Sequence, residues 1–350
     1  MTRRRRLLFA LIALCLAVGM PMIGAELFLR SRGPLRVHGV TFSHPVLHHA
    51  HRPGWTAQIE SFTSEYDSFP VAFDQDGCRY DPQASSTEHG SEPNRIAFLG
   101  DSFVEAYQVP YAESFVARVE KEFGTRAWVR NYGTTSYSPI LSLLQWRTSI
   151  KSWKPTHVVF MLYTNDVDRS TALSDADYLE KAVRDDHGEV TAIPGSESKV
   201  EGFLRQFHLA WELMRVYRGL QHRALHPKAA NESTGAFTEP NPDVEEPTPS
   251  ILLKLKQEVE STGARFTLTV VPSKLRHVTP DTPHDGPEFS DKWKAWSAKQ
   301  GIDFIDLAAT FREHASQHET LFFKEDIHFN PAGHSVAAQV IASALRPALK

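Results

Sequence analysis

Arg95-Ile-Ala-Phe-Leu-Gly100-Asp101-Ser102-Phe103 is the stretch that decides the fold. Its first six residues form a short, mostly apolar run that predicts a buried strand, and Gly100 predicts a turn where that strand ends. In a parallel α/β sheet, ligands bind at the carboxyl ends of the strands, so Ser102 stands where chemistry is expected. A serine at such a turn can expose its Oγ and lend its own backbone N–H to a developing oxyanion. Gly-Asp-Ser also forms ordinary turns, so the tripeptide needs support from the rest of the chain.

Downstream of this stretch, apolar segments that predict strands alternate with segments that have helical spacing. His157–Tyr163 is a continuous apolar run, as expected of a parallel strand buried on both faces. This alternation predicts an α/β domain with a five-stranded parallel sheet covered by helices on both faces. The expected strands are 95–100, 127–129, 157–163, 265–271 and 302–305, and the expected helices are 114–123, 140–153, 251–260, 291–299 and 331–345.

Three further polar motifs fall at strand ends or at the rim of the predicted sheet. Asn131-Tyr-Gly133 follows the second strand, Tyr163-Thr-Asn165-Asp166 ends the third, and Glu325-Asp326-Ile327-His328 precedes the last helix. An acyl-transfer site needs a nucleophile, a base, a group that orients the base, and donors for the oxyanion. The chain supplies one of each in Ser102, His328, Asp326, and the Gly133 N–H with the Asn165 side chain.

These four blocks resemble those of the SGNH (GDSL-type) hydrolase superfamily in content and order: GDS, a glycine, an asparagine in G-x-N-D, and an acid shortly before a histidine. They extend from Gly100 to His328, so the resemblance covers most of the chain after about residue 93. It implies a flavodoxin-like three-layer sandwich and hydrolysis of esters, often of acyl groups on carbohydrates or lipids. It also implies that Ser102 is the nucleophile, that His328 is the general base, and that the oxyanion hole consists of the Ser102 N–H, Gly133 and Asn165.

Two positions depart from the superfamily's pattern. Tyr163 stands where the third block usually has glycine, so the backbone conformation at this position can differ from that of the superfamily. Asn165 stays in its place in the motif. The acid at the commoner spacing, three residues before His328, is Glu325, whereas Asp326 lies two residues before it. Some relatives that acetylate polysaccharides look similar in using aspartate-x-histidine, and we therefore expect Asp326 to be the triad acid.

Other interpretations of these residues stay open. An α/β-hydrolase is disfavoured because Val104 stands where G-x-S-x-G requires its second glycine. Asp101 can simply cap a turn, and Asn165 can cap a helix. His334, inside the last helix, is the nearest alternative to His328 as a functional histidine.

The composition argues against several classes of protein and site. A net charge of -4 argues against a general nucleic-acid binder, which carries a basic face. Cys15 and Cys78 are the only cysteines, and they fit neither a zinc motif nor a redox motif. Four histidines between residues 44 and 51 predict a solvated loop rather than a metal site, because no nearby carboxylate or cysteine completes a definite geometry. We expect neither a metal nor a cofactor.

The N-terminus predicts a membrane anchor. Arg3 to Arg6 form a block of positive charge, and the 19 residues from Leu7 to Ala25 carry no charge. At about 1.5 Å per residue this run spans roughly 29 Å, close to the hydrocarbon thickness of a bilayer. The arginines should stay cytoplasmic, which places the rest of the chain in the periplasm or its equivalent. A cleaved signal peptide ending near Gly24-Ala25 is the alternative, although the apolar run exceeds the usual roughly 7–15 residues.

The expected organisation is a cytoplasmic basic tail over residues 1–6, a transmembrane signal-anchor over 7–28, a connector over 29–92, and an SGNH hydrolase domain over 93–350 with an insertion at 167–250. The connector is expected to contain short strands, for example around Pro70 to Phe73. Within the insertion, Val200 to Leu220 predicts an amphipathic helix that either packs over the sheet or acts as a lid.

The leading hypothesis is a membrane-anchored serine esterase that removes acyl groups, acetyl first among them, from a cell-envelope carbohydrate or lipid. The alternative is an O-acyltransferase, in which the same acyl-serine passes its acyl group to a polysaccharide hydroxyl. A third candidate is a non-catalytic binding protein on an SGNH fold, and the joint presence of Ser102, Asn165 and His328 counts against it. The expected partners are the acylated substrate and the membrane, with no nucleic acid.

Overall fold

The computed structural model of the chain forms two compact units, one of Met1–His38 with Glu197–Ser233 and the other of Gly39–Ser196 with Thr234–Lys350. The second unit contains all the candidate site residues. The residues that the structure describes are 3–33, 35–37, 39–61, 63–82, 90, 92–166, 182–184, 190–192, 199–204, 206–225, 248–272, 274 and 289–349.

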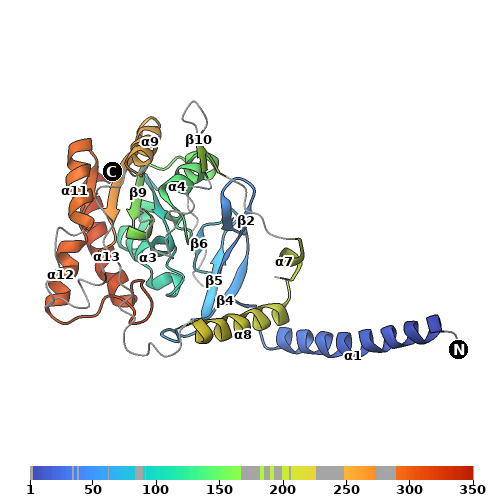
Figure 1. Cartoon of the computed structure of the whole chain (residues 1–350). Helices are drawn as coiled ribbons and strands as arrows, with labels where there is room; N and C mark the ends of the chain where they lie inside the picture. Colours follow the sequence, from blue (N-terminus) through green and yellow to red (C-terminus); the bar gives the residue numbers. More distant parts are fainter. Residues whose placement is uncertain are drawn as a thin grey trace. The chain divides into compact units, whose positions relative to one another are not determined.

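The second unit is built around one mixed β-sheet (Figure 1). Its strands are β4 (Thr56–Ile59), β5 (Phe69–Phe73), β6 (Arg79–Tyr80), β7 (Asn94–Gly100), β8 (Ala127–Asn131), β9 (His157–Leu162), β12 (Arg265–Val270) and β13 (Asp303–Ile305). They follow in the order β4-β5-β6-β8-β7-β9-β12-β13 across the sheet. All pairings from β8 to β13 are parallel. β7 and β9 therefore lie in the interior of the parallel part, where the sequence predicted the most continuous apolar strands.

The prediction of an α/β sandwich is confirmed, but the prediction of a five-stranded sheet is wrong, because the sheet is larger. Five parallel strands are present, and β4, β5 and β6 extend the sheet beyond β8 in antiparallel pairs. These strands come from the segment predicted to be a connector with short strands, and β5 confirms the strand expected around Pro70 to Phe73. The contact with β8 is a single pair, Arg79 with Asn131, and it covers an edge that would otherwise leave backbone N–H and C=O groups unpaired.

Helices cover both faces of the parallel strands. The helices of the second unit are α2 (Ser102–Glu105), α3 (Phe115–Phe123), α4 (Pro139–Gln145), α5 (Lys151–Trp153), α9 (Thr248–Glu260), α11 (Phe289–Gln300), α12 (Ala308–Ser316) and α13 (Pro331–Leu345), with a π-helical turn η3 (Trp146–Ile150) between α4 and α5 and short 3-10 turns η1 (Tyr111–Glu113), η2 (Gly124–Arg126), η4 (Thr164–Asp166) and η5 (Arg346–Ala348). α13 has the bounds that the sequence predicted, because Asn330 caps it and Pro331 occupies its first turn. α12 was not predicted.

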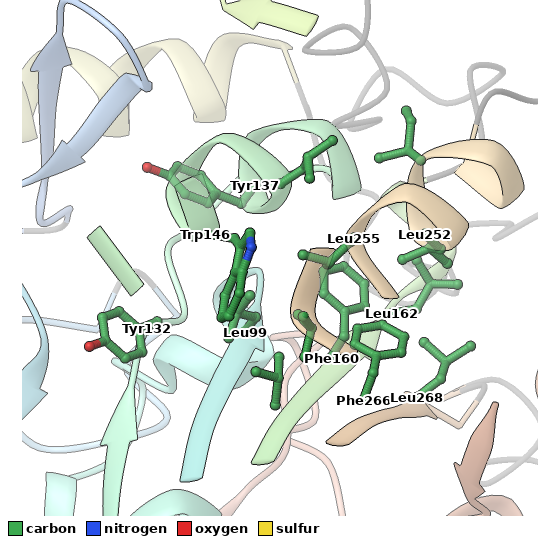
Figure 2. Close-up of a cluster of buried hydrophobic side chains, with 14 of the residues drawn as sticks. Leu99, Tyr132, Tyr137, Trp146, Phe160, Leu162, Leu252, Leu255, Phe266 and Leu268 are labelled. Carbon is green, nitrogen blue, oxygen red and sulfur yellow. The ribbon is translucent and has the colours of Figure 1, made fainter. Parts of the chain in front are cut away.

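Two large hydrophobic clusters form the core, one on each face of the sheet, and a small third cluster groups Ala106, Val109 and Phe323. Along β7 the side chains alternate, so that Ala97 and Leu99 join one cluster, and Ile96 and Phe98 join the other. The first cluster packs β7, β9 and β12 against α4, α9 and α11, and Figure 2 shows its central side chains. The second packs the opposite face against α3, α12 and α13. Because both faces are buried, the sheet fixes where β7 ends and where the chain turns into α2.

Two small antiparallel pairs lie outside the main sheet. β2 (Thr41–His44) pairs with β3 (His48–His51), and β10 (Ala182–Arg184) pairs with β11 (Val190–Ala192). The β2–β3 hairpin carries the histidine cluster. The prediction of a solvated loop is wrong for His49 and His51, because both side chains are buried.

The first unit contains α1 (Arg3–Ser31), β1 (Arg36–Val37), α7 (Lys199–Leu204) and α8 (His208–Leu225). α1 is 29 residues long, reaches a mean hydropathy of 2.5, and is long and apolar enough to cross a membrane. The Glu26 carboxylate accepts hydrogen bonds from the backbone N–H groups of His208 and Leu209, at 3.2 and 2.8 Å, and so caps the start of α8. The sequence predicted a single helix between residues 200 and 220. That prediction is wrong, because the structure has two helices there, α7 and α8.

Candidate active site

The turn from β7 into α2 presents Ser102. Gly100 has a φ of +151°, and a Cβ on it would lie 2.7 Å from the Met161 carbonyl oxygen, so only glycine fits this turn. Asp101 caps α2, because its Oδ1 accepts a hydrogen bond from the Phe103 N–H at 2.9 Å. Ser102 is the first residue of α2, so its N–H has no carbonyl partner within the helix. The turn therefore places a hydroxyl and a backbone donor at the carboxyl end of the sheet.

His328 reaches Ser102 from the segment that precedes α13. Its Nε2 lies 2.7 Å from the Ser102 Oγ. Both residues are buried, with 7% of Ser102 and 8% of His328 exposed. The imidazole packs on the Phe103 ring, with 4.8 Å between the ring centroids. This geometry lets the hydroxyl donate to Nε2 when the ring proton sits on Nδ1.

Asp326 contacts the other side of the same imidazole. Its Oδ1 is hydrogen-bonded to the His328 Nδ1 and also accepts the His328 backbone N–H at 2.9 Å. Burial acts to raise the pKa of Asp326, but His328 and its hydrogen bonds outweigh burial and hold that pKa below its ordinary value. The Glu325 side chain is 48% exposed and lies 3.7 Å from the Lys324 Nζ. The structure thus brings Asp326, and not Glu325, to His328.

The block around Gly133 is locked to the turn that carries Ser102. A Cβ on Gly133 would lie 2.2 Å from the Glu105 backbone nitrogen, so a larger residue does not fit. Asn131 donates from Nδ2 to the Val104 carbonyl at 2.7 Å, and its Oδ1 accepts the Gly133 N–H at 2.9 Å. In this structure the Gly133 N–H is directed to Asn131, so its place in an oxyanion hole stays a prediction.

The third predicted block lies at the end of β9. Asn165 belongs to the turn η4 (Thr164–Asp166), and its side chain lies outside the part of the chain that the structure describes. Its role in an oxyanion hole likewise stays a prediction. The neighbouring Asp166 is buried, and its Oδ2 accepts the Tyr163 N–H at 2.9 Å. Tyr163 is also buried, with its ring centroid 4.6 Å from that of Phe103.

Comparison with known proteins now assigns the domain. Residues 238–350, which include Asp326 and His328, match a family model described as the SGNH hydrolase-like domain of the acetyltransferase AlgX. Over residues 238–350 the chain is therefore similar to an SGNH hydrolase-like domain. The resemblance inferred from the four sequence blocks is confirmed at this level. No curated protein matches the chain.

Several solved structures are similar to this chain at low identity and low TM-score. An α/β hydrolase from the metagenome of Lake Arreo, Spain, is 14% identical, with a TM-score of 0.43, over 73% of this chain and 96% of that one. A lipolytic protein of the G-D-S-L family from Veillonella parvula is 17% identical, with a TM-score of 0.37, over 71% and 96%. A catalytic mutant of the acetylxylan esterase Axe2 from Geobacillus stearothermophilus is 14% identical, with a TM-score of 0.41, over 73% and 94%. These values assign no activity to this chain.

The sequence analysis missed two buried residues beside the candidate site, Gln108 and Glu105. The Gln108 side-chain Nε2 lies 2.8 Å from the His328 Nδ1. Glu105 is hydrogen-bonded through Oε1 to the His51 Nε2 at 2.8 Å and through Oε2 to the Thr135 N–H at 2.6 Å. Burial acts to raise the pKa of Glu105, but His51 and Thr135 hold that pKa below its ordinary value. The only signal in the sequence was the position of Gln108 and Glu105 just after the serine.

A buried arginine ties the same turn to β6. Arg79 donates from Nη1 to the Glu105 carbonyl at 2.9 Å and from Nη2 to the Val109 carbonyl at 2.6 Å. Among the described residues, no group of three or more His, Cys, Asp or Glu side chains is placed to hold a metal ion. The site brings a serine hydroxyl, an imidazole and a carboxylate into hydrogen-bonded series.

Proposed function

We propose that this protein is a serine esterase that removes acyl groups, acetyl first among them, from a carbohydrate or lipid of the cell envelope. The observation that carries the proposal is the 2.7 Å separation between the Ser102 Oγ and the His328 Nε2, with the Asp326 carboxylate on the other ring nitrogen. A nucleophile, a base and an orienting acid in hydrogen-bonded series are the parts that covalent acyl transfer requires.

The reaction follows from these three side chains. The Ser102 Oγ attacks the ester carbonyl carbon while the His328 Nε2 takes the hydroxyl proton. The imidazolium then gives this proton to the departing alcohol oxygen, which leaves an acyl group on Ser102. Water, deprotonated by the same nitrogen, attacks the acyl carbon. The imidazolium then returns this proton to the departing Ser102 Oγ, which releases the carboxylic acid and free Ser102. Asp326 fixes the proton on Nδ1 and stabilises the imidazolium in both steps.

The expected oxyanion donors are the Ser102 N–H, the Gly133 N–H and the Asn165 side chain. The first two come from the turns after β7 and β8, and Asn165 comes from the turn after β9. Use of the Gly133 N–H requires it to leave the Asn131 Oδ1, its present acceptor. One oxyanion donor contributes on the order of 10²–10³-fold in turnover.

O-acyl transfer to a carbohydrate hydroxyl is the second candidate, and the match of residues 238–350 to a domain named for an acetyltransferase favours it. The two activities share the acyl–Ser102 intermediate and differ in the acceptor that attacks it. A cell-envelope substrate is supported by α1, whose length and hydropathy suit a membrane anchor, and by the arginines before it, which favour an extracytoplasmic catalytic unit.

The full chain in detergent, given an activated acetyl ester, tests both candidates. We expect hydrolysis, and mass spectrometry after rapid acid quench should find one added acetyl group on the peptide that contains Ser102. Addition of an oligosaccharide acceptor then separates the activities, because a transferase diverts the acetyl group to the sugar while an esterase releases acetate. Ser102→Ala is the control for non-enzymatic acetylation. Absence of both acetyl-enzyme and turnover would favour the non-catalytic binding protein.

A further inference from the structure

The short loop that carries Asp326 is held by a carboxylate from a distant part of the chain. Glu65, which lies between β4 and β5, accepts three backbone N–H groups of this loop. Its Oε1 accepts from Lys324 at 2.5 Å, and its Oε2 accepts from Glu325 at 3.0 Å and from Asp326 at 2.8 Å. Three consecutive amides directed at one carboxylate define the position and the orientation of the loop backbone.

An ammonium group holds the carbonyl side of the same loop. The Lys274 Nζ donates to the carbonyl oxygens of Lys324 and Asp326, at 2.9 Å each. The N–H of Asp326 therefore bonds to Glu65 while its C=O bonds to Lys274. The residue is fixed on both sides of its backbone, and its carboxylate is left to face the His328 imidazole.

Glu65 is itself held in place by its own turn. Its backbone N–H donates to the Ser61 Oγ at 3.1 Å, and its Oε2 also accepts from the Thr63 Oγ1 at 3.0 Å. The adjacent Tyr66 packs on Phe323, just before the loop, with 5.5 Å between the ring centroids. A carboxylate fixed in this way acts as a rigid template and loses little freedom when it binds the loop.

We propose that Glu65 is a positioning residue that sets the Asp326–His328 hydrogen bond. The oppositely charged Lys274 holds the carbonyl side of the same loop. The proposal rests on the proposed esterase function for its effect on turnover. Its structural content, the geometry of the Asp326–His328 pair, does not depend on that function. It also gives the segment before residue 92 a part in the chemistry, since this segment supplies Glu65.

The test compares three variants of the full chain in detergent. Glu65→Ala removes all three acceptors, whereas Glu65→Gln keeps the shape but turns one oxygen into an NH₂ group that cannot accept an N–H. Asp67→Asn is the matched control, because it removes the same charge from an exposed side chain two residues away. The readouts are kcat and KM on an acetyl ester, and the proton resonance of the His328 Nδ1–H in protein labelled with nitrogen-15 at histidine.

We expect Glu65→Ala to lower kcat by about 10²-fold with KM nearly unchanged, as for a displaced catalytic group. In Glu65→Ala the far-downfield Nδ1–H resonance of His328 should weaken or move upfield. Glu65→Gln should show a smaller effect of the same kind. Asp67→Asn should resemble wild type. A role confined to stability would lower the melting temperature and leave the resonance and kcat in place, which would overturn the proposal. If Glu65→Ala does not fold, Glu65→Gln and Lys274→Gln carry the same test.

Failure of the esterase function is distinguishable from failure of this inference. If Ser102→Ala keeps full turnover, the proposed function fails, but the Nδ1–H resonance still reports whether Glu65 sets the Asp326–His328 pair. If the resonance is the same in Glu65→Ala and wild type, the inference fails whatever the activity.

Discussion

The His328 Nε2 and the Ser102 Oγ lie 2.7 Å apart although 226 positions separate the two residues in the chain. β7 delivers Ser102 at the carboxyl end of the sheet. His328 is delivered by a loop pinned on both sides, since Phe322 bridges to Phe329 and Asn330 caps α13. The sheet and one helix start therefore hold the pair, and the Glu65 carboxylate adds a further contact to the loop just before His328.

Replacement of the serine hydroxyl tests the nucleophile. We expect Ser102→Ala to lower ester hydrolysis by on the order of 10³-fold or more, because the covalent intermediate can no longer form. Stability should change by about 1 kcal/mol or less, since one hydrogen bond is lost. Turnover and thermal unfolding of both proteins measure this, and turnover within a few-fold of wild type would show that Ser102 is misassigned.

The two neighbouring acids give a paired comparison. Asp326→Ala removes the group that holds the His328 tautomer and should lower turnover by on the order of 10³–10⁴-fold. Glu325→Ala removes a side chain that is half exposed and does not contact His328 in this structure, so it should stay within a few-fold of wild type. Turnover on one acetyl ester, with circular dichroism to confirm folding, decides the comparison. A larger loss for Glu325→Ala would refute the assignment.

The motifs that carry chemistry were the most predictable part of the site, because residue type and order reveal them. Ser102, Asp326 and His328 were named from the sequence, and the structure brings them together. Gln108 and Glu65 were not named, because a glutamine or glutamate gains its role only from a partner more than two hundred positions away. No local pattern encodes such a pairing.

The same limit explains the sheet. Strands buried on both faces can be recognised in a sequence as continuous apolar runs. The predicted strand His157–Tyr163 differs from β9 (His157–Leu162) by one residue. β4, β5 and β6 are two to five residues long, β5 contains Pro70, and the pairing of these strands with the rest of the sheet depends on the edge of β8. The histidines of β3 were misjudged for the same reason, because the Glu105 carboxylate that binds His51 lies 54 positions away.

Membrane topology follows from the first helix. A reporter fused after Lys350 should be active only outside the cytoplasm, because Arg3 to Arg6 favour the cytoplasmic side of α1. Replacement of these four arginines by alanine should weaken this orientation and serves as the control. The molecular mass of the protein recovered from the membrane fraction distinguishes a retained anchor from a cleaved signal peptide. A cytoplasmic signal from the wild-type fusion would contradict the predicted topology.

A methyl group at Gly133 should damage both folding and turnover. Its Cβ would lie 2.2 Å from the Glu105 nitrogen and 2.5 Å from the Val104 carbonyl carbon, so α2 must shift. We expect Gly133→Ala to cost about 1–3 kcal/mol of stability and to reduce turnover by displacing Ser102. Gly39→Ala is the matched control, because no atom lies within 4 Å of its added methyl group. Equal melting temperatures for the two variants would contradict the steric argument.

His334 should make the protein sensitive to acid. It is buried in α13, and its Nδ1 accepts the Phe115 N–H at 3.3 Å, which requires a neutral ring. Burial lowers the pKa of His334 to about 3, and the charges of Arg79, His328 and Arg118 add to this. The unfolded chain takes up the proton near pH 6.5, so stability is complete above that pH and falls as the pH drops toward 3.

Between pH 6.5 and 5 the loss from this one residue should be about 2 kcal/mol. His334→Asn keeps an acceptor for the Phe115 N–H but does not titrate, so its stability should fall less over the same range. Some acid sensitivity should remain, because burial also lowers the pKa of His49, to about 4. Urea unfolding of both proteins at pH 7.5, 6.5 and 5 measures the difference. If the free energy of unfolding changes with pH equally in the two proteins, His334 is protonated equally in the folded and unfolded states. The description of His334 as a buried neutral ring would then be wrong.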